Sequence, residues 1–278
     1  MFDVSHPQVR SAVERALEED IGAGDVTTEL TVPPDLRARG SFIAKQDFVL
    51  AGIELLPLIY ERIGEAEVSL FAETGAQICA GKTLATVSAN AGTLLSCERV
   101  ALNFLQRLSG VATLARQYAE AVAGTGTRVL DTRKTTPGLR VLEKMAAAAG
   151  GAVNHRRGLF DGVLIKNNHI TAAGGVKEAL AKVKHFNGPI EIEVRTRSEL
   201  DAALQAGAKH LLLDNLSPAE AREWVAYIAG RATIELSGGI RLSNIHSYAE
   251  AGADFVSCGA ITHSAVAVDI SFRLELEQ

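Results

Sequence analysis

The sequence predicts an α/β protein, and three observations about its second half support that class. Six short apolar runs recur between residues 128 and 259, and helical segments that end at glycine lie between them. Successive runs begin about 20 to 35 residues apart, which is the length of a strand–helix unit. Such units form a parallel sheet or an α/β barrel. Because only six or seven of them fit, a barrel would be incomplete.

Composition narrows the class further. The chain has 278 residues, of which 47% are hydrophobic and 22% charged, so it can bury a sizeable core in one large or about two domains. Its net charge of −5 argues against a general nucleic-acid binder, which is usually basic. Aromatic residues make up only 5%, so stacking on single-stranded bases is not expected either.

Cysteine usage and hydropathy indicate the compartment. Cys79, Cys97 and Cys258 are far apart and form no CxxC pair, so neither a disulfide framework nor a zinc site is expected. The first 20 residues lack the apolar core of a signal peptide. No uninterrupted apolar run reaches the roughly 18 residues of a membrane helix. We therefore expect a cytoplasmic protein with no membrane partner.

The first hundred residues have a different pattern from the rest. Residues 9–19 are amphipathic and predict a short helix, and the turn-rich sequence DIGAGD follows at 20–25. β-prone runs at 40–44 and 67–71 predict strands. A long helix without proline is expected over 96–123.

The second half is more regular. Its predicted helices cover 198–206, 218–229 and 243–251, the last with Ser243 as its N-cap. Its six predicted strands cover 128–132, 163–166, 190–194, 211–214, 233–237 and 254–259.

Polar residues and glycines follow these strands. In a barrel the carboxyl ends of the strands surround one mouth, where active sites lie. The sequence therefore predicts two cations, two carboxylates and two phosphate-type loops around that mouth: Arg133, Lys166, Glu193, Asp214, Ser237 and Gly259.

Positive charge is concentrated between Asp131 and Ile170, where seven Lys and Arg residues face three acidic ones. A basic pocket in an acidic protein suits a small polyanion, and arginine binds carboxylate or phosphate by two-point hydrogen bonding. We expect Arg133, Lys134, Arg156 and Lys166 to bind it. Three further basic residues are expected to lie on solvated helix faces: Arg140, Lys144 and Arg157.

Carboxylates occupy the predicted strand at 190–194. Glu191 and Glu193 share one face because side chains alternate along a strand, and there they need partners such as Lys166. Glu193 and Asp214 could hold Mg²⁺ through water or bind ribose hydroxyls. The alternative is a structural buried ion pair, which is as well supported as a functional role for Glu191 and less well supported for Glu193 and Asp214.

Glycine loops follow the last two strands. The sequence Ser237-Gly238-Gly239 follows one strand and Cys258-Gly259-Ala260 the other, with His263 four residues beyond Gly259. Two such loops are typical of a barrel phosphate site, where backbone N–H groups receive the anion. No Walker A, G-x-S-x-G, H-E-x-x-H or Rossmann motif is present.

The sequence resembles the quinolinate phosphoribosyltransferase family over nearly its whole length and in order. Asn167 is a departure, since the family usually has aspartate there, but it lies beside Lys166 and does not replace it. The segments that carry the resemblance are EEDIGAGDVTT (18–28), ERVALNF (98–104), DTRKTTPGLR (131–140), NHR (154–156), VLIKNNHI (163–170) and GAITHS (259–264).

The resemblance implies an N-terminal α/β sandwich domain (1–108 with the tail 265–278) and an incomplete, six- to seven-stranded α/β barrel domain (109–264). It implies a homodimer, or a larger oligomer such as a hexamer, with Arg99 reaching into the partner's active site. The implied reaction transfers phosphoribosyl from phosphoribosyl pyrophosphate to quinolinate. It releases pyrophosphate and CO₂, gives nicotinate mononucleotide for NAD biosynthesis and uses Mg²⁺ as cofactor.

The resemblance also implies roles for individual residues. Arg133, His155 and Arg156 would hold the quinolinate carboxylates, with Thr132 beside them. Lys134 and Lys166 would bridge the two substrates. Glu193 and Asp214 would serve the ribose hydroxyls and the Mg²⁺-pyrophosphate, the ion being held mainly by the substrate. The 5-phosphate would be bound by Ser237, Gly238, Gly239, Cys258, Gly259, Ala260 and His263.

Three alternatives stay open on the sequence. One is a sister pyrophosphorylase of the molybdenum-transport type, with the same fold and another ring substrate. A second is a barrel lyase or aldolase that uses Lys166 as a Schiff-base nucleophile. The third is a non-catalytic sensor of pyridine nucleotides. Asp20 and Asp25 are either helix caps or contacts to a partner subunit.

Overall fold

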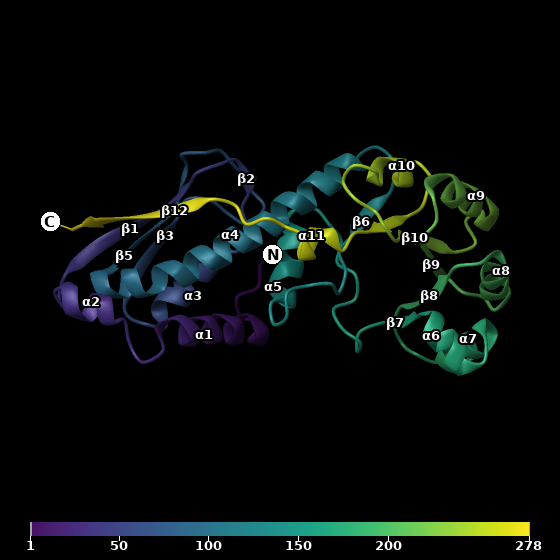
Figure 1. The fold of residues 1–278 in the computed structure, drawn as a ribbon, viewed down its shortest axis with the longest axis horizontal. Helices are drawn as coiled ribbons and strands as arrows, with labels where there is room; N and C mark the ends of the chain where they lie inside the picture. Colours follow the sequence, from purple (N-terminus) through teal and green to yellow (C-terminus); the bar gives the residue numbers. More distant parts are fainter. Residues whose placement is uncertain (1, 278) are drawn as a thin grey trace. The chain divides into compact units, whose positions relative to one another are not determined.

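A computed structural model describes residues 2–277 of the chain (Figure 1). Its contacts divide it into two units. The first unit extends to Arg116 and also contains Thr135–Gly151 and the segment from Thr262 onward, and the second contains Gln117–Lys134 and Ala152–Ile261. The segment 135–151 was assigned from the sequence to the barrel domain; the domain boundaries themselves stay a prediction. No helix in the described part of the chain is long and apolar enough to cross a membrane.

The first unit is built around a four-stranded antiparallel sheet in the order β12-β1-β5-β3. Its C-terminal strand, β12, pairs with β1 from Ala38↔Leu276 to Ala44↔Ile270, so the chain's tail completes the sheet. The strands are β1 (Arg37–Ala44), β3 (Ala66–Leu70), β5 (Thr83–Asn90) and β12 (Ile270–Leu276), with a small pair β2 (Phe48–Val49) and β4 (Gln77–Ile78).

Helices of the first unit include α1 (Pro7–Ile21), which confirms the helix expected over 9–19. It is followed by α2 (Val26–Thr31), which was not predicted. The Asp25 carboxylate caps α2 by accepting from the Thr28 backbone N–H at 3.0 Å and from its hydroxyl at 2.6 Å. The remaining helices are α3 (Leu55–Glu61), α5 (Arg140–Ala149) and α4 (Ala91–Ala121), which confirms the long predicted helix and continues into the second unit.

An apolar, aromatic core holds the first unit together. Phe42 on β1 is fully buried and lies 5.0 Å from the ring of Phe272 and 6.5 Å from that of Tyr60. Gly40 makes this packing possible, because a Cβ there would lie 2.0 Å from the Phe272 ring.

The second unit contains a six-stranded parallel sheet in the order β6-β11-β10-β9-β8-β7. β6 and β7 are its two edges and do not pair, so the barrel is incomplete, as predicted. The strands are β6 (Arg128–Leu130), β7 (Val163–Ile165), β8 (Ile190–Val194), β9 (His210–Asp214), β10 (Thr233–Ser237) and β11 (Phe255–Ser257).

Short helices alternate with these strands. α8 and α9 begin at capping boxes made by Thr196 with Glu199 and by Ser217 with Glu220. The expected cap Ser243 is wrong: the N-cap of α10 is Asn244, whose side chain accepts from the Arg241 amide at 2.7 Å. The helices are α6 (Asn167–Ala173), α7 (Val176–Val183), α8 (Arg197–Gln205), α9 (Pro218–Ile228), α10 (Ile245–Ala249) and α11 (Ala260–His263).

The parallel sheet has one apolar face and one polar face. Ile192, Val194, Leu211 and Leu213 are buried on the first. Side chains alternate along a strand, so their neighbours point to the other face. The register places Glu193 beside Leu212 and Leu212 beside Glu235, with Asp214 beside Ser237 in the next row. The fold therefore gathers charged groups from three adjacent strands at one end of one sheet face.

Candidate active site

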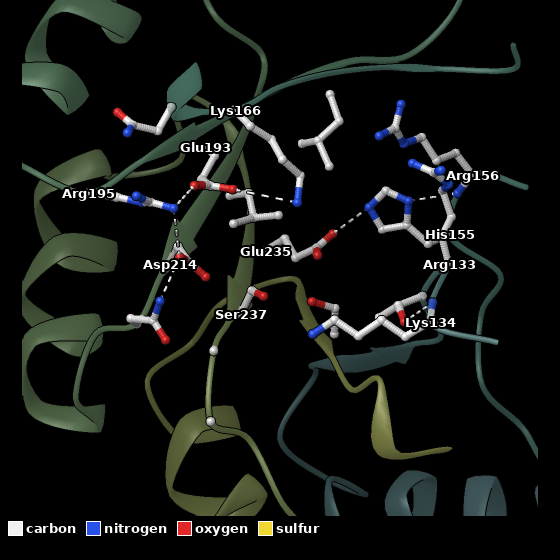
Figure 2. Close-up of a pocket in the computed structure, with 18 of the residues that line it drawn as sticks. Arg133, Lys134, His155, Arg156, Lys166, Glu193, Arg195, Asp214, Glu235 and Ser237 are labelled. Atoms are coloured by element: carbon white, nitrogen blue, oxygen red, sulfur yellow. Dashed lines mark hydrogen bonds and ion pairs between the residues drawn. The ribbon is translucent and has the colours of Figure 1, made fainter. Parts of the chain in front are cut away.

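A cavity of about 700 Å³ opens over the polar face of the parallel sheet (Figure 2). All of its lining residues belong to the second unit. Eleven of the residues predicted from the sequence line it: Thr132, Arg133, Lys134, His155, Arg156, Lys166, Glu193, Asp214, Ser237, Gly238 and Gly239. The carboxyl ends of the strands thus meet at one site, as the barrel argument predicted.

Five predicted residues do not line this cavity. Cys258 is buried, its amide donates to the Leu130 carbonyl at 3.0 Å, and burial raises the pKa of its thiol to about 12. Arg99 is exposed on α4 and His263 ends α11; both belong to the first unit. Gly259 lies between β11 and α11 and Ala260 is the first residue of α11, and both are outside the cavity lining.

A buried aspartate organises the basic end of the cavity. Asp131 follows β6 directly and is fully buried. Its carboxylate accepts from the His155 backbone N–H at 2.8 Å and from the Asn154 side chain at 2.7 Å. The next turn is fixed by the Thr132 hydroxyl, which accepts from the Lys134 amide at 3.0 Å. Asp131 therefore ties the Arg133–Lys134 segment to the His155–Arg156 segment.

Arg156 presents a guanidinium with unused hydrogen-bonding capacity. One Nη donates to the Gly162 carbonyl at 3.0 Å, whereas its buried Nε has no hydrogen-bond partner among the described residues. Burial, together with the positive charge of Arg133, lowers the pKa of Arg156. A buried donor without a partner and a second cation nearby favour binding of an anion at this point.

His155 is held at both ring nitrogens. Its Nε2 lies 3.2 Å from Glu191 Oε2 and 3.4 Å from Glu235 Oε2, and its Nδ1 accepts from the Arg156 backbone N–H at 2.7 Å. Burial of the ring lowers the pKa of His155, whereas the hydrogen bonds that Nε2–H donates to the Glu191 and Glu235 carboxylates raise it. A second proton on Nδ1 would remove the acceptor from the Arg156 amide, which opposes the charged form. We therefore place the ring proton on Nε2.

His155, Glu191 and Glu235 are also the one group of three or more His, Cys, Asp or Glu residues in the described chain whose ligand atoms are close enough for a metal. Their donor atoms lie within 4.8 Å of one another. A histidine nitrogen binds metal through its lone pair. Because Nδ1 already uses its lone pair, Nε2 carries the hydrogen, and the arrangement fits a hydrogen-bonded cluster rather than a metal site.

A chain of charges crosses the opposite side of the cavity (Figure 2). Glu193 is buried, with Arg195 Nη2 2.6 Å from its Oε1 and Lys166 Nζ 3.9 Å from its Oε2. The same Arg195 nitrogen lies 3.6 Å from Asp214 Oδ2. The pairing of Glu193 with Lys166 confirms the partner expected from the sequence.

The glycine loop after β10 packs tightly against the turn after β9. The Asn215 amide donates to the Ser237 carbonyl at 2.9 Å. Gly238 has a φ of +97°, and a Cβ there would lie 2.2 Å from the Asn215 side-chain oxygen. Only glycine fits both constraints, so this loop can bring its backbone close to a ligand.

The cavity is also lined by three residues that were not predicted from the sequence: Arg195, Asn215 and Glu235. Period-two alternation could have identified Glu235, because it shares the face of Ser237. Arg195 follows the last residue of β8 and could have been counted with the other strand-end residues. With them, five cations and three carboxylates surround the cavity, which suits a polyanionic substrate.

Comparisons with known proteins agree with this site. The family models for the N-terminal and C-terminal domains of quinolinate phosphoribosyl transferase match residues 25–109 and 111–273. The chloroplastic nicotinate-nucleotide pyrophosphorylase (carboxylating) of Arabidopsis thaliana is 38% identical, over 98% of this chain and 85% of its own. A mitochondrial quinolinate phosphoribosyltransferase (decarboxylating) of Nicotiana tabacum is 37% identical, over 98% and 84%.

The fold agrees as well. The crystal structure of NadC from Streptococcus pyogenes matches with a TM-score of 0.95 at 35% identity and covers 100% of both chains. These findings support the quinolinate reading over the molybdenum-transport and Schiff-base alternatives. The chain belongs to the quinolinate phosphoribosyltransferase family.

Proposed function

We propose that this chain transfers the phosphoribosyl group of phosphoribosyl pyrophosphate to quinolinate, with loss of CO₂, and so forms nicotinate mononucleotide for NAD biosynthesis. The observation that carries the proposal is one cavity that joins two arginines, two lysines and two strand-end carboxylates to a glycine loop. Such a cavity offers separate places for a dicarboxylate and a phosphorylated sugar.

Quinolinate would bind at the basic end. The guanidiniums of Arg133 and Arg156 supply two-point hydrogen bonds to its carboxylates, and the unpartnered Nε of Arg156 gains an acceptor there. Lys134 and Lys166 line the same cavity, and their ammonium groups would contact both substrates. Nicotinate lacks the carboxylate next to the ring nitrogen, so it would leave one of these cations without a partner.

The phosphoribosyl donor would bind at the other end. Ser237, Gly238 and Gly239 supply a hydroxyl and backbone N–H groups to the 5-phosphate. Glu193 and Asp214 face the ribose hydroxyls. In the loop after β11, we propose that Gly259 and Ala260 contribute backbone groups to the phosphate site and that His263 completes it.

The chemistry follows from these positions. The ring nitrogen of quinolinate attacks the anomeric carbon of the ribose. The bond between that carbon and the pyrophosphate oxygen breaks at the same time, and positive charge develops on the sugar. The buried Glu193 carboxylate stabilises that charge. The alkylated ring then loses the carboxylate next to nitrogen as CO₂. The electron pair left on carbon is stabilised by the cationic nitrogen, and that carbon takes up a proton.

Magnesium enters this proposal with the substrate. The carboxylates of Glu193 and Asp214 are oxygen donors of the type that Mg²⁺ prefers. They are already contacted by Arg195, and Asp214 also accepts from the Asn215 side chain at 2.7 Å. Two carboxylates engaged in this way do not form a cage for a resident ion. They fit an ion that the pyrophosphate carries, with water between ion and protein, and such an ion would neutralise the leaving group.

We further propose a cytoplasmic homodimer, or a hexamer, in which Arg99 of one subunit completes the quinolinate site of another. The exposure of Arg99 on α4 supports this arrangement. Sedimentation with and without substrate, and mixing of Arg99→Ala with Lys166→Ala subunits, would test it. Activity that returns on mixing would show a shared site.

One assay tests the reaction. Purified protein is incubated with Mg²⁺, phosphoribosyl pyrophosphate and quinolinate, and quinolinate absorbance and CO₂ release are followed. Nicotinate serves as the control ring. Turnover of quinolinate alone is expected. No turnover with quinolinate, although the donor still binds, would contradict the proposal.

A further inference from the structure

The parallel sheet carries one buried and one mostly buried carboxylate that the reaction chemistry does not use. Glu191 on β8 and Glu235 on β10 have side chains only 14% and 5% exposed. Burying two carboxylates is costly unless partners compensate for the lost water. The ligand atoms of the two carboxylates lie within 4.8 Å of each other, and burial together with the neighbouring Glu235 raises the pKa of Glu191. A pair of this kind in a sheet interior needs a structural or functional reason.

Both carboxylates converge on the same atom. His155 Nε2 lies 3.2 Å from one and 3.4 Å from the other, although the three residues come from a loop and two non-adjacent strands. The other ring nitrogen accepts from the Arg156 amide at 2.7 Å. A neutral imidazole has one N–H and one lone pair, and this geometry uses each once. The ring therefore connects the sheet interior to the backbone of Arg156.

Arg156 needs such a connection because it lies in an irregular segment. Residues 154–162 contain no helix or strand and follow the isolated bridge between Leu130 and Val153 near the open edge of the sheet. Asp131 fixes the start of the segment through the His155 amide. Beyond that point, the ring of His155 and the Gly162 carbonyl are the contacts that fix Arg156. A binding group on a loop is accurate only if surrounding hydrogen bonds hold it.

We propose that Glu191 and Glu235 are positioning residues for quinolinate: by holding the His155 ring through Nε2–H they fix the Arg156 backbone through Nδ1, and so set the guanidinium in place for a carboxylate of the substrate. This rests on the proposed function and changes the role of His155. In addition to lining the cavity, the residue acts through the backbone of Arg156. Glu235 also lines the cavity, so the cluster forms part of the wall behind the ring site.

Two substitutions of Glu235 distinguish the effect of its hydrogen bond to the His155 ring from the effect of its negative charge. Glu235→Gln keeps a side-chain oxygen that accepts from Nε2–H, whereas Glu235→Leu has similar size and no acceptor. Glu235→Leu is expected to weaken quinolinate binding about 10- to 100-fold, the range typical when a group that orients a histidine is removed. Glu235→Gln is expected to change it by about threefold, since a neutral acceptor replaces a charged one. Glu223→Leu on the exposed face of α9 is the matched control.

The measurements are calorimetric affinities and the KM of each substrate. For Glu235→Leu, the KM of quinolinate should rise while the affinity for phosphoribosyl pyrophosphate, measured alone, stays within about twofold. Equal losses for both substrates, an unchanged quinolinate affinity, or equal losses in the Gln and Leu variants would overturn the proposal.

A spectroscopic readout does not depend on the variants folding. Long-range ¹⁵N–¹H correlation of the wild-type histidines should show His155, assigned with His155→Gln, carrying hydrogen on Nε2 and a lone pair on Nδ1. Hydrogen on Nδ1 would contradict the geometry on which the proposal stands. Failure of the wild type to bind or turn over quinolinate would instead remove the proposed function, so the two failures are distinguishable.

Discussion

The antiparallel and the parallel sheet use their faces in opposite ways. The first buries Phe42 and Phe272 against each other, so its packed side is apolar and its stability comes from removing that area from water. The second packs Ile192 and Leu213 on one face and exposes Glu193, Asp214 and Ser237 to a cavity on the other. In this protein, the strands that are apolar on one face and charged on the other line the candidate active site. The strands packed against aromatic rings stabilise the fold.

The largest effect is expected from a substitution in the core of the antiparallel sheet. Phe42→Ala should destabilise the first unit by about 3–5 kcal/mol, since it removes a fully buried ring and leaves a cavity. Both KM values should stay close to those of the wild type. Calorimetric unfolding and steady-state kinetics test this, with Phe71→Ala as control because Phe71 is 53% exposed. If the folded Phe42→Ala variant lost substrate affinity, the antiparallel sheet would contribute to substrate binding as well as to stability.

The next effect removes charge from the polar face without changing its shape. Glu193→Gln should lower kcat by about 10²- to 10³-fold, the range observed when one electrostatic contact to a transition state is lost. Its melting temperature should change little, because Gln keeps the volume. Pre-steady-state measurement of pyrophosphate release tests the chemical step. A change confined to KM would assign Glu193 to binding only.

A smaller effect separates the two ends of the cavity. Arg133→Ala should reduce quinolinate affinity by about 10- to 100-fold, as expected for loss of charge-assisted hydrogen bonds, while phosphoribosyl pyrophosphate binds as before. Titration calorimetry with each substrate alone measures both, and Arg222→Ala on the exposed part of α9 is the control. Equal loss of both affinities would contradict the assignment.

The smallest effect concerns a cap in the first unit. Asp25→Ala removes the side chain that accepts from Thr28 and should destabilise α2 by about 1 kcal/mol without altering kcat. Hydrogen bonds from Thr28 hold the pKa of the Asp25 carboxyl below its usual value. This stabilisation is present above the unfolded pKa and is lost as the pH falls through the folded one. Amide exchange of residues 26–31 at pH 7 and pH 3 tests both statements.

The sequence was most informative where local pattern and topology agree. Short apolar runs that recur at a regular spacing predicted the parallel strands, and strand ends then predicted the cavity residues Lys166, Glu193 and Asp214. The fold class and the family were confirmed as well. Such predictions succeed because carboxyl ends of parallel strands always share an edge.

The misses have a different physical origin. The strands β2 and β4 are two residues long and exist only because each pairs with the other. The helix α2 is rich in Thr and Val, which are poor helix formers, and depends on its Asp25 cap. The hydrogen bonds of His155 depend on side chains 36 and 80 residues further along the chain, and no local pattern shows them. Contacts of this range are set by packing, which a single sequence does not display.

The open, charged face of the parallel sheet has a consequence for how the protein can be studied. In most domains the core is complete before any small molecule binds, but under the proposed function two substrates would bind in the charged cavity over this sheet and neutralise its charges. Substrate binding to the native state alone raises its stability by RT ln(1 + [L]/Kd), about 2.7 kcal/mol at a hundredfold excess over Kd. The melting temperature of the second unit should therefore rise with the fraction of cavities that hold a ligand. Inhibitors could then be ranked by this shift even with inactive variants, in which no turnover can be followed.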